Sequence, residues 1–247
     1  WDTGDGKISL SCNADGVPCE KTNTAWRAAE AFFTFTKKRN PGIGLKIKKR
    51  IPVSAGLAGG STDAAAVLVA LNELMNTRLS KEELCDIGED VGADVPFCIM
   101  GATMVATGIG TILTPAPDMP ECSILVAKPP VSVSTKEAYA LADDRESYWE
   151  PHTDDAVEAV CDGELQKIAD SLYNDFEELI HLKEVDNIKE LMLENGALGA
   201  CMSGSGPTVF GLFEDQGAAE DCAGLLEKDC EMVTVCRPLD HGCIILD

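Results

Sequence analysis

The feature that most constrains this chain is a glycine- and alcohol-rich segment that runs directly into alanines. Residues 52–66 read P-V-S-A-G-L-A-G-G-S-T-D-A-A-A. Glycine allows positive φ angles and a close approach of the backbone to a ligand. Ser61, Thr62 or Asp63 can cap the helix that the alanines predict. Because a helix N-terminus offers unpaired N–H groups and partial positive charge, the pattern predicts a loop that binds phosphate.

A simpler interpretation of the same segment is a tight turn that only leads into a core helix. Two common phosphate loops do not fit it. The G-x-x-x-x-G-K-[ST] pattern needs a lysine, and none lies between Arg50 and Lys81. The G-x-G-x-x-G pattern of dinucleotide-binding folds is also missing. The segment therefore predicts a phosphate loop of another class, and the simple turn stays open as the alternative.

Composition limits the classes of protein and partner. The chain has 247 residues, 45% hydrophobic and 5% aromatic, which predicts one large or two modest domains with an aliphatic core. A formal net charge of −22 argues against nucleic acid or an anionic membrane as a partner, since either would need a basic face. The same charge opposes binding of ATP unless Mg²⁺ and backbone dipoles reverse the local field.

Cysteine and histidine usage predicts the redox state and the absence of a metal cluster. The 11 cysteines form no C-x-x-C pair and only 3 histidines are present, so we expect free thiols in a reducing cytosol and no bound zinc. The sequence shows no secretory leader and no apolar run long enough to span a membrane. We therefore expect a cytoplasmic protein. The sequence does not decide its oligomeric state, and a monomer or a homodimer is expected.

Hydrophobic periodicity predicts strands and helices that mix without a regular repeat, which indicates an α+β fold in two layers. Asn23 is the expected cap of the first helix, and Ser80 with Glu83 forms a capping-box pattern. Residues 92–97 and 196–207 are expected to be loops, and residues 143–163 an acidic surface. The expected strands are 7–12, 44–51, 103–107, 111–113, 123–128, 208–213 and 231–236, and the helices 23–37, 61–75, 81–91, 135–141, 163–172, 176–180, 185–195 and 216–228.

Two further segments contain residues suited to chemistry. Residues 202–208 read M-S-G-S-G-P-T, and alone they favour a tight connection between a helix and a strand. Residues 92–97 read G-A-D-V-P-F, which places Asp94 in a rigid and otherwise apolar loop. That carboxylate is either a local turn cap or a general acid or base, and the pattern leaves both readings open.

Taken together, these segments resemble the GHMP small-molecule kinases. Further matches are N-T-A-x-R-A from Asn23, V-S-T-x-x-A-Y from Val133 and N-D-F-E from Asn174, so the resemblance covers nearly the whole chain. The glycine loop and S-G-S-G-P-T are shared across the superfamily, whereas G-A-D-V-P-F is typical of one branch. The resemblance implies a ribosomal-protein-S5-domain-2-like N-terminal domain over residues 1–100 and a ferredoxin-like C-terminal domain over 101–247.

The resemblance also implies a reaction. This branch transfers the γ-phosphoryl group of ATP, with Mg²⁺, to the 2-hydroxyl of 4-diphosphocytidyl-2-C-methyl-D-erythritol, in non-mevalonate isoprenoid biosynthesis. Asp94 would be the catalytic base, and residues 203–208 would close the site from the C-terminal domain. The implied ATP-binding residues are Pro52, Val53, Ser54, Ala55, Gly56, Leu57, Ala58, Gly59, Gly60, Ser61 and Thr62, with no protein side chain assigned to a metal.

The sequence departs from the family pattern in two places. Ala58 and Thr62 replace a glycine and a serine, and both are small enough for the loop to keep its form. A front strand of the type A-K-I-N-L and a G-Y-H segment are not in the sequence, so we expect a truncated chain with little kinase activity. Two alternatives stay open: another GHMP kinase, acting on homoserine, mevalonate or a sugar, and an inactive nucleotide-binding remnant.

Overall fold

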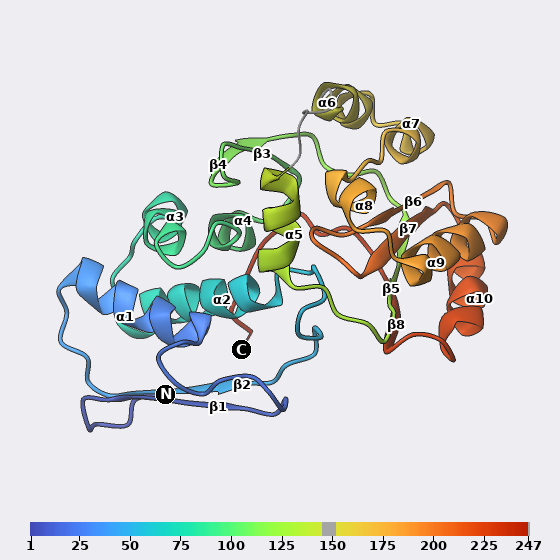
Figure 1. Cartoon of the computed structure of the whole chain (residues 1–247). Helices are drawn as coiled ribbons and strands as arrows, with labels where there is room; N and C mark the ends of the chain where they lie inside the picture. Colours follow the sequence, from blue (N-terminus) through green and yellow to red (C-terminus); the bar gives the residue numbers. More distant parts are fainter. Residues whose placement is uncertain (145–151, 247) are drawn as a thin grey trace. The chain divides into compact units, whose positions relative to one another are not determined.

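The structure is a computed structural model that describes residues 1–144 and 152–246 (Figure 1). Its contacts divide the chain into two compact units. Trp1–Val53, Ala58–Pro115 and Leu239–Asp247 form the first unit, and Ser54–Leu57 and Ala116–Pro238 form the second. Helices and strands are mixed in both units, which confirms the α+β prediction. The boundary between residues 100 and 101 stays a prediction.

The first unit is built on a β-α-β start. Strands β1 and β2 run parallel, with Ile8 opposite Ile43, and helix α1 connects them. Strands β3 and β4 form the predicted antiparallel hairpin. The elements of this unit are β1 (Ile8–Cys12), α1 (Thr24–Thr36), β2 (Ile43–Ile47), α2 (Gly59–Leu74), α3 (Lys81–Glu89), α4 (Val95–Met100), β3 (Met104–Thr107) and β4 (Ile112–Pro115).

Local signals explain where the helices of this unit begin. Asn23 Oδ1 accepts a hydrogen bond of 2.8 Å from the Ala25 N–H group, which confirms the predicted cap of α1. Ser80 and Glu83 form the predicted capping box at the start of α3. Helices α1 and α2 lie side by side (Figure 1), and Phe32 and Leu68 are fully buried in the core that they share. This core holds the start of α2 in place.

The second unit contains a four-stranded antiparallel sheet in the order β6-β7-β5-β8. With helices α9 and α10 in the crossovers this is a β-α-β-β-α-β arrangement, which confirms the predicted ferredoxin-like topology. The elements are β5 (Ser123–Lys128), α5 (Thr135–Asp143), α6 (Thr153–Asp162), α7 (Leu165–Asp170), α8 (Asp175–Leu179), α9 (Lys183–Glu194), β6 (Gly199–Met202), β7 (Val209–Phe213), α10 (Gln216–Leu226) and β8 (Met232–Cys236).

Both faces of this sheet are covered. Neighbouring residues on a strand point to opposite faces, and Leu212 and Phe213 of β7 accordingly belong to two different cores. Phe213 is buried with residues of α9 and α10, including Met192 and Leu226. Leu212 is buried with Ile168 of α7 and with a residue of α6. The sheet is therefore enclosed between two helical layers within this unit.

Three predictions of loop or surface segments are wrong. Residues 92–97 are not all loop, because α4 begins at Val95, with Pro96 in its first turn, where the missing N–H group costs nothing. The acidic stretch 143–163 contains helix α6, and its residues 145–151 lie outside the described part of the chain. The expected loop 196–207 contains strand β6, which pairs with β7.

Candidate functional site

Helix α2 begins with an N-terminus that no side chain caps. Its N-cap is Ala58, at φ 48°, and the helix starts at Gly59 rather than near Ser61. The prediction that Ser61, Thr62 or Asp63 caps this helix is wrong, because all three lie inside the helix. The first backbone bond joins the Thr62 N–H group to the Ala58 carbonyl, at 2.9 Å. The N–H groups before Thr62 therefore have no acceptor within the helix and are suited to an anion.

Side chains instead hold the carbonyl groups of this first turn. Lys49 Nζ donates to the Gly59 oxygen at 2.7 Å, and Thr24 Oγ1 donates to the Gly60 oxygen at 2.7 Å. Thr62 Oγ1 donates to the Ala58 oxygen at 3.1 Å. Three successive peptide groups are thus fixed from their carbonyl sides, which leaves the N–H side of the turn open.

Lys49 is a functional candidate that the sequence reasoning missed. Its side chain is only 8% exposed and forms an ion pair of 2.5 Å with Asp63. A signal was present, because residues 45, 47 and 49 alternate with exposed residues 46 and 48. The alternation continues two residues past the end of β2 at Ile47, so Lys49 lies on the inner side with Leu45 and Ile47.

Asp94 lies at the N-cap position of α4, with an exposed side chain that caps no N–H group of that helix. The structure brings its segment next to the start of α2, within the first unit. Thr62 Oγ1 and Cys98 Sγ, one turn after Asp94, lie 3.5 Å apart in a hydrogen bond. A Cβ atom added to Gly92 would lie 4.0 Å from Ser61 Oγ. The exposed carboxylate and the uncapped turn of α2 are therefore neighbours.

The part of the glycine loop that belongs to the second unit packs on the second Gly/Ser segment. Gly56 has φ 71°, and a Cβ atom there would overlap the Ser203 carbonyl oxygen and lie 2.9 Å from the Gly206 nitrogen. Ser203 Oγ donates a hydrogen bond of 2.8 Å to the Gly56 carbonyl. Residues 202–208 are thus more than a connection between elements, because they position residues 54–57.

The N-D-F-E segment holds this second loop. The Asn174 amide donates to the carbonyl oxygens of Met202, at 2.7 Å, and Gly204, at 2.8 Å. Glu177 accepts a hydrogen bond from the Met202 N–H group and pairs with Lys189. The motif matched the family pattern in the sequence, and the structure shows what Asn174 and Glu177 do.

The cysteine thiols beside α2 are protonated at neutral pH. Burial raises the pKa of Cys98, and burial raises the pKa of Cys243 to about 11. A thiol is a nucleophile only as the thiolate, so these two cysteines are poor nucleophiles at neutral pH. All 11 cysteines are free, which confirms the prediction from their spacing.

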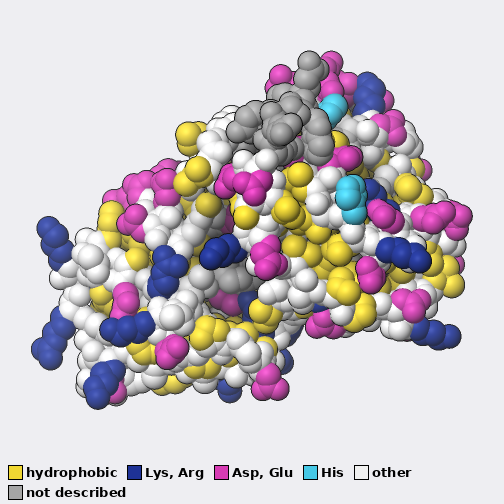
Figure 2. Space-filling view, in the orientation of Figure 1, with side chains coloured by type: hydrophobic (Ala, Val, Ile, Leu, Met, Phe, Trp, Pro, Cys, Tyr) yellow, Lys and Arg dark blue, Asp and Glu magenta, His cyan; other side chains and the backbone are white. Residues whose placement is uncertain are grey.

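In residues 1–144 and 152–246, no three His, Cys, Asp or Glu side chains come together as a metal site. Over the same ranges, no helix has the length and apolar character needed to cross a membrane. Asp and Glu side chains are scattered over the face shown in Figure 2, as the net charge of −22 leads one to expect.

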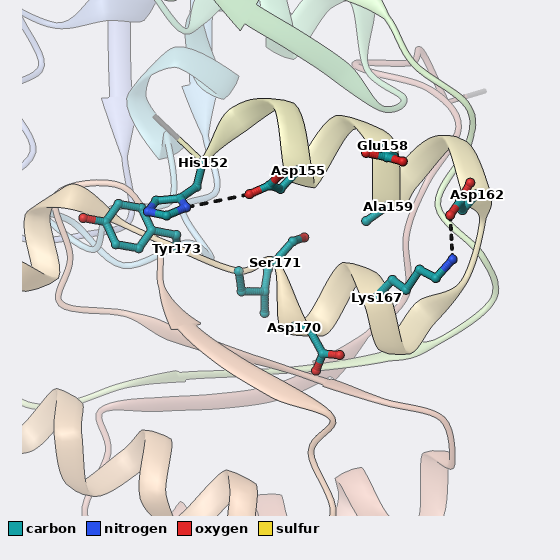
Figure 3. A pocket seen from close by; sticks show the side chains of 10 residues that line it. His152, Asp155, Glu158, Ala159, Asp162, Lys167, Asp170, Ser171 and Tyr173 are labelled. Atoms are coloured by element: carbon teal, nitrogen blue, oxygen red, sulfur yellow. Dashed lines mark hydrogen bonds and ion pairs between the residues drawn. The ribbon is translucent and has the colours of Figure 1, made fainter. Parts of the chain in front are cut away.

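A cavity of about 500 Å³ lies between α6 and α7 in the second unit (Figure 3). At one end the ring centroids of His152 and Tyr173 lie 4.7 Å apart. At the other end Lys167 Nζ forms an ion pair of 2.6 Å with Asp162 Oδ2. Carboxylates outnumber cations in its lining, which includes Asp155, Glu158 and Asp170. None of the residues predicted to bind ATP or to act as a base lines this cavity.

Comparison with known proteins identifies the family. Residues 23–102 match the GHMP kinases N terminal domain, and residues 156–228 match the GHMP kinases C terminal. The matches cover the glycine loop and Asp94 in the first domain, and Asn174 and Ser203 in the second. Both halves of the predicted GHMP fold are therefore present.

Similar curated proteins share one name, 4-diphosphocytidyl-2-C-methyl-D-erythritol kinase. The protein from Alkaliphilus metalliredigens is 43% identical over 218 residues, which are 87% of this chain and 75% of that protein. The protein from Clostridium beijerinckii is 40% identical over 237 residues, which are 95% of this chain and 84% of that protein. Identity at this level over most of both chains shows membership of one family.

Solved structures agree with this assignment. A crystal structure of 4-(cytidine 5'-diphospho)-2C-methyl-D-erythritol kinase aligns with TM-score 0.74 and 28% identity, covering 94% of this chain and 82% of that one. Homoserine kinase from Cytophaga hutchinsonii aligns with TM-score 0.80 at 20% identity, covering 94% and 81%, which shows the shared fold alone. This chain belongs to the GHMP kinases and, within them, to the 4-diphosphocytidyl-2-C-methyl-D-erythritol kinase family.

Proposed function

We propose that this chain transfers the γ-phosphoryl group of ATP to the 2-hydroxyl of 4-diphosphocytidyl-2-C-methyl-D-erythritol, a step of non-mevalonate isoprenoid biosynthesis. The identity of 40% to 43% with relatives of that name supports the substrate. The match of both GHMP kinase domains supports the use of ATP.

The observation that carries this proposal is the placement of Asp94 beside the uncapped start of α2 in one unit. In the proposed site, the ATP phosphates lie against the N–H groups of residues 59–61, and the loop 52–62 wraps the nucleotide. Asp94 accepts the proton of the substrate hydroxyl as the hydroxyl attacks. Phosphoryl transfer depends mainly on such positioning and on charge stabilisation rather than on covalent catalysis.

Mg²⁺ is the proposed counter-ion of ATP. When bound, it neutralises charge on the phosphates. This neutralisation reduces the repulsion between ATP and a chain of net charge −22. Mg²⁺ in kinases is held largely by phosphate oxygens and water, with one or two carboxylates.

The test is an ADP-release assay with ATP, Mg²⁺ and a panel of acceptors. The panel contains 4-diphosphocytidyl-2-C-methyl-D-erythritol, homoserine, mevalonate and galactose, and the relative from Alkaliphilus metalliredigens serves as a positive control. We expect slow turnover with the first acceptor only, well below the rate of the relative, in line with the low activity expected from the sequence. Phosphorus NMR of the product should show a new phosphomonoester. Faster turnover of another acceptor would reassign the substrate, and ATP binding without turnover of any acceptor would favour the remnant.

A further inference from the structure

We infer that Lys49 is a positioning residue for ATP: it aims the backbone N–H groups at the start of α2 and cancels the charge of Asp63 beside them. This inference rests on the proposed function, because it assumes that the phosphates bind at that turn. Lys49 does not itself touch the nucleotide in this proposal.

The Lys49 ammonium is held in one place from both ends of the residue. At the tip, Nζ donates to the Gly59 oxygen at 2.7 Å and to Asp63 Oδ2 at 2.5 Å. At the backbone, Asn13 Oδ1 accepts from the Lys49 N–H group at 2.5 Å, and Asn13 Nδ2 donates to the Lys49 carbonyl at 3.3 Å. These four bonds take the place of bonds to water, and they hold the Lys49 side chain, which is flexible in most lysines, at the first turn of α2.

The bond to the Gly59 carbonyl has a directional consequence for the next N–H group. A trans peptide group is planar, so its C=O and N–H bonds point in opposite directions. Drawing the Gly59 oxygen toward Lys49 therefore turns the Gly60 N–H group away from Lys49. Thr24 Oγ1 acts in the same way on the Gly60 oxygen, at 2.7 Å, and so orients the Ser61 N–H group.

Glycine at position 59 leaves the room that this arrangement requires. A Cβ atom on Gly59 would lie 3.0 Å from Lys49 Nζ and 3.1 Å from Ile51 Cγ2. Both distances are tighter than ordinary van der Waals contact, so a side chain there would push the ammonium away from the carbonyl. Glycine at position 59 is thus needed for the approach of the Lys49 ammonium as well as for backbone flexibility.

The ion pair has an electrostatic consequence. Asp63 lies in the second turn of α2, with its side chain 21% exposed, where a free carboxylate would repel a polyphosphate. Lys49 neutralises it within the wall of the site. Removing the ammonium would expose the phosphates to one more negative charge and leave the Gly59 carbonyl without its side-chain donor.

The experiment measures nucleotide binding by calorimetry and uses the full chain. The test variant is Lys49→Met, and the matched control is Lys48→Met, at the adjacent and exposed lysine. We expect Lys49→Met to weaken ATP binding about 10- to 100-fold, as loss of a partner for buried polar and charged groups does. Affinity for adenosine, which has no phosphate, should stay within about threefold of wild type, and Lys48→Met should change neither affinity appreciably.

Two further variants test whether Lys49 positions the N–H groups or only stabilises the fold. The first removes the carboxylate that Lys49 neutralises, and the second removes a neutral hydrogen bond at the same turn. Asp63→Asn added to Lys49→Met should recover part of the ATP affinity, because it removes the unpaired carboxylate. Thr24→Val should weaken ATP binding a few-fold, with adenosine unaffected, through the Ser61 N–H group alone. This second variant keeps the proposal testable if Lys49→Met does not fold.

The outcomes distinguish this inference from the proposed function. Equal loss of ATP and adenosine affinity in Lys49→Met, or wild-type ATP affinity in Lys49→Met, would each overturn the positioning role. Wild-type ATP affinity in Thr24→Val would overturn its premise, that side-chain bonds to the carbonyls of this turn orient the N–H groups that bind phosphate. If the unaltered chain does not bind ATP at all, the proposed function itself fails. If the unaltered chain turns over the acceptor but the Lys49 variant binds ATP normally, the inference fails alone.

Discussion

The Ser203 hydroxyl donates a hydrogen bond of 2.8 Å to the carbonyl oxygen of Gly56, a residue 147 positions earlier in the chain. Both residues belong to the second unit, although Gly56 lies in a short segment whose flanking residues belong to the first. The contact joins the two Gly/Ser segments that the sequence suggested independently. Each of the two segments therefore helps to hold the other in its conformation.

The first prediction concerns Gly56. Replacing it by alanine is expected to lower the free energy of unfolding by about 3 kcal/mol, and to reduce kinase turnover, because a Cβ atom overlaps the Ser203 carbonyl and φ is 71°. Urea unfolding followed by circular dichroism measures the first effect. The control is Gly224→Ala in α10, where a Cβ atom meets nothing within 4 Å; helix propensity there predicts about 0.5–1 kcal/mol of stabilisation. Equal effects of the two changes would contradict the steric argument.

The second prediction concerns Asp94. Asp94→Asn preserves the size of the side chain and removes the proton acceptor, so turnover should fall about 100-fold or more while ATP affinity changes little. Steady-state kinetics and ATP calorimetry on the same protein separate the two quantities. Asp90→Asn, at an exposed carboxylate four residues away, should leave turnover unchanged. Normal turnover in Asp94→Asn would remove this residue from the role of base.

The third prediction concerns the support of the second loop. Asn174→Ala removes two hydrogen bonds to the carbonyls of Met202 and Gly204, and the cap of the Phe176 N–H group. We expect a loss of about 2–3 kcal/mol in unfolding free energy, since each bond to a loop carbonyl contributes about 1 kcal/mol. Asn195→Ala removes a single bond, to the Leu191 carbonyl, at an exposed helix end. It should cost about 1 kcal/mol or less by the same measurement.

The fourth prediction concerns the C-terminal residues of the first unit. A Cβ atom on Gly101 would overlap the Gly242 nitrogen and lie 2.5 Å from its Cα atom, so Gly101→Ala should displace residues 241–243 from α4. Limited proteolysis should then cleave the chain near Gly242 faster than in wild type. Gly110→Ala has a positive φ of 100° but open space around the new atom. It controls for backbone strain, and faster cleavage in it as well would show that strain alone is responsible.

The fifth prediction concerns alkaline pH. Burial raises the pKa of the Cys201 thiol to about 12 from its ordinary value of 9.0, so the folded state keeps this proton to a higher pH than the unfolded state does. Its contribution to stability is complete below pH 9.0 and is lost as the pH rises toward about 12. The stability deficit of Cys201→Ala should therefore shrink above pH 9.0, by at most about 1.4 kcal/mol per pH unit. Cys19→Ala, at an exposed thiol, should shift stability by less than about 0.5 kcal/mol at any pH.

Local patterns predicted most of the elements and the motifs of the site. The cap at Asn23 and the hairpin β3–β4 depend on near neighbours in the chain, and both are confirmed. Helix α2 was expected to start near Ser61 because Gly59 and Gly60 have poor helix propensity, but it starts at Gly59. Long-range bonds from Lys49 and Thr24 hold those glycines in the helix, and no local signal predicts such bonds.

The sequence predicted the segments of the candidate site but not the residues that hold those segments in place. The glycine loop and Asp94 are visible in the sequence because their residue types are unusual in their positions. Lys49 was overlooked because lysine is mostly exposed, and its inner position follows only from the alternation with Leu45 and Ile47. The pairing of Ser203 with Gly56 depends on the return of a distant segment, which periodicity cannot predict.

The contact of Gly242 with Gly101 has a consequence for biosynthesis. Residues 1–53 and 58–115 leave the ribosome early, but the unit that they form also contains residues 239–247. A nascent chain must therefore carry an unfinished first unit while the whole second unit is translated, whereas domains generally fold as they emerge. We expect the first unit to be the part of this chain that most needs protection by chaperones during synthesis.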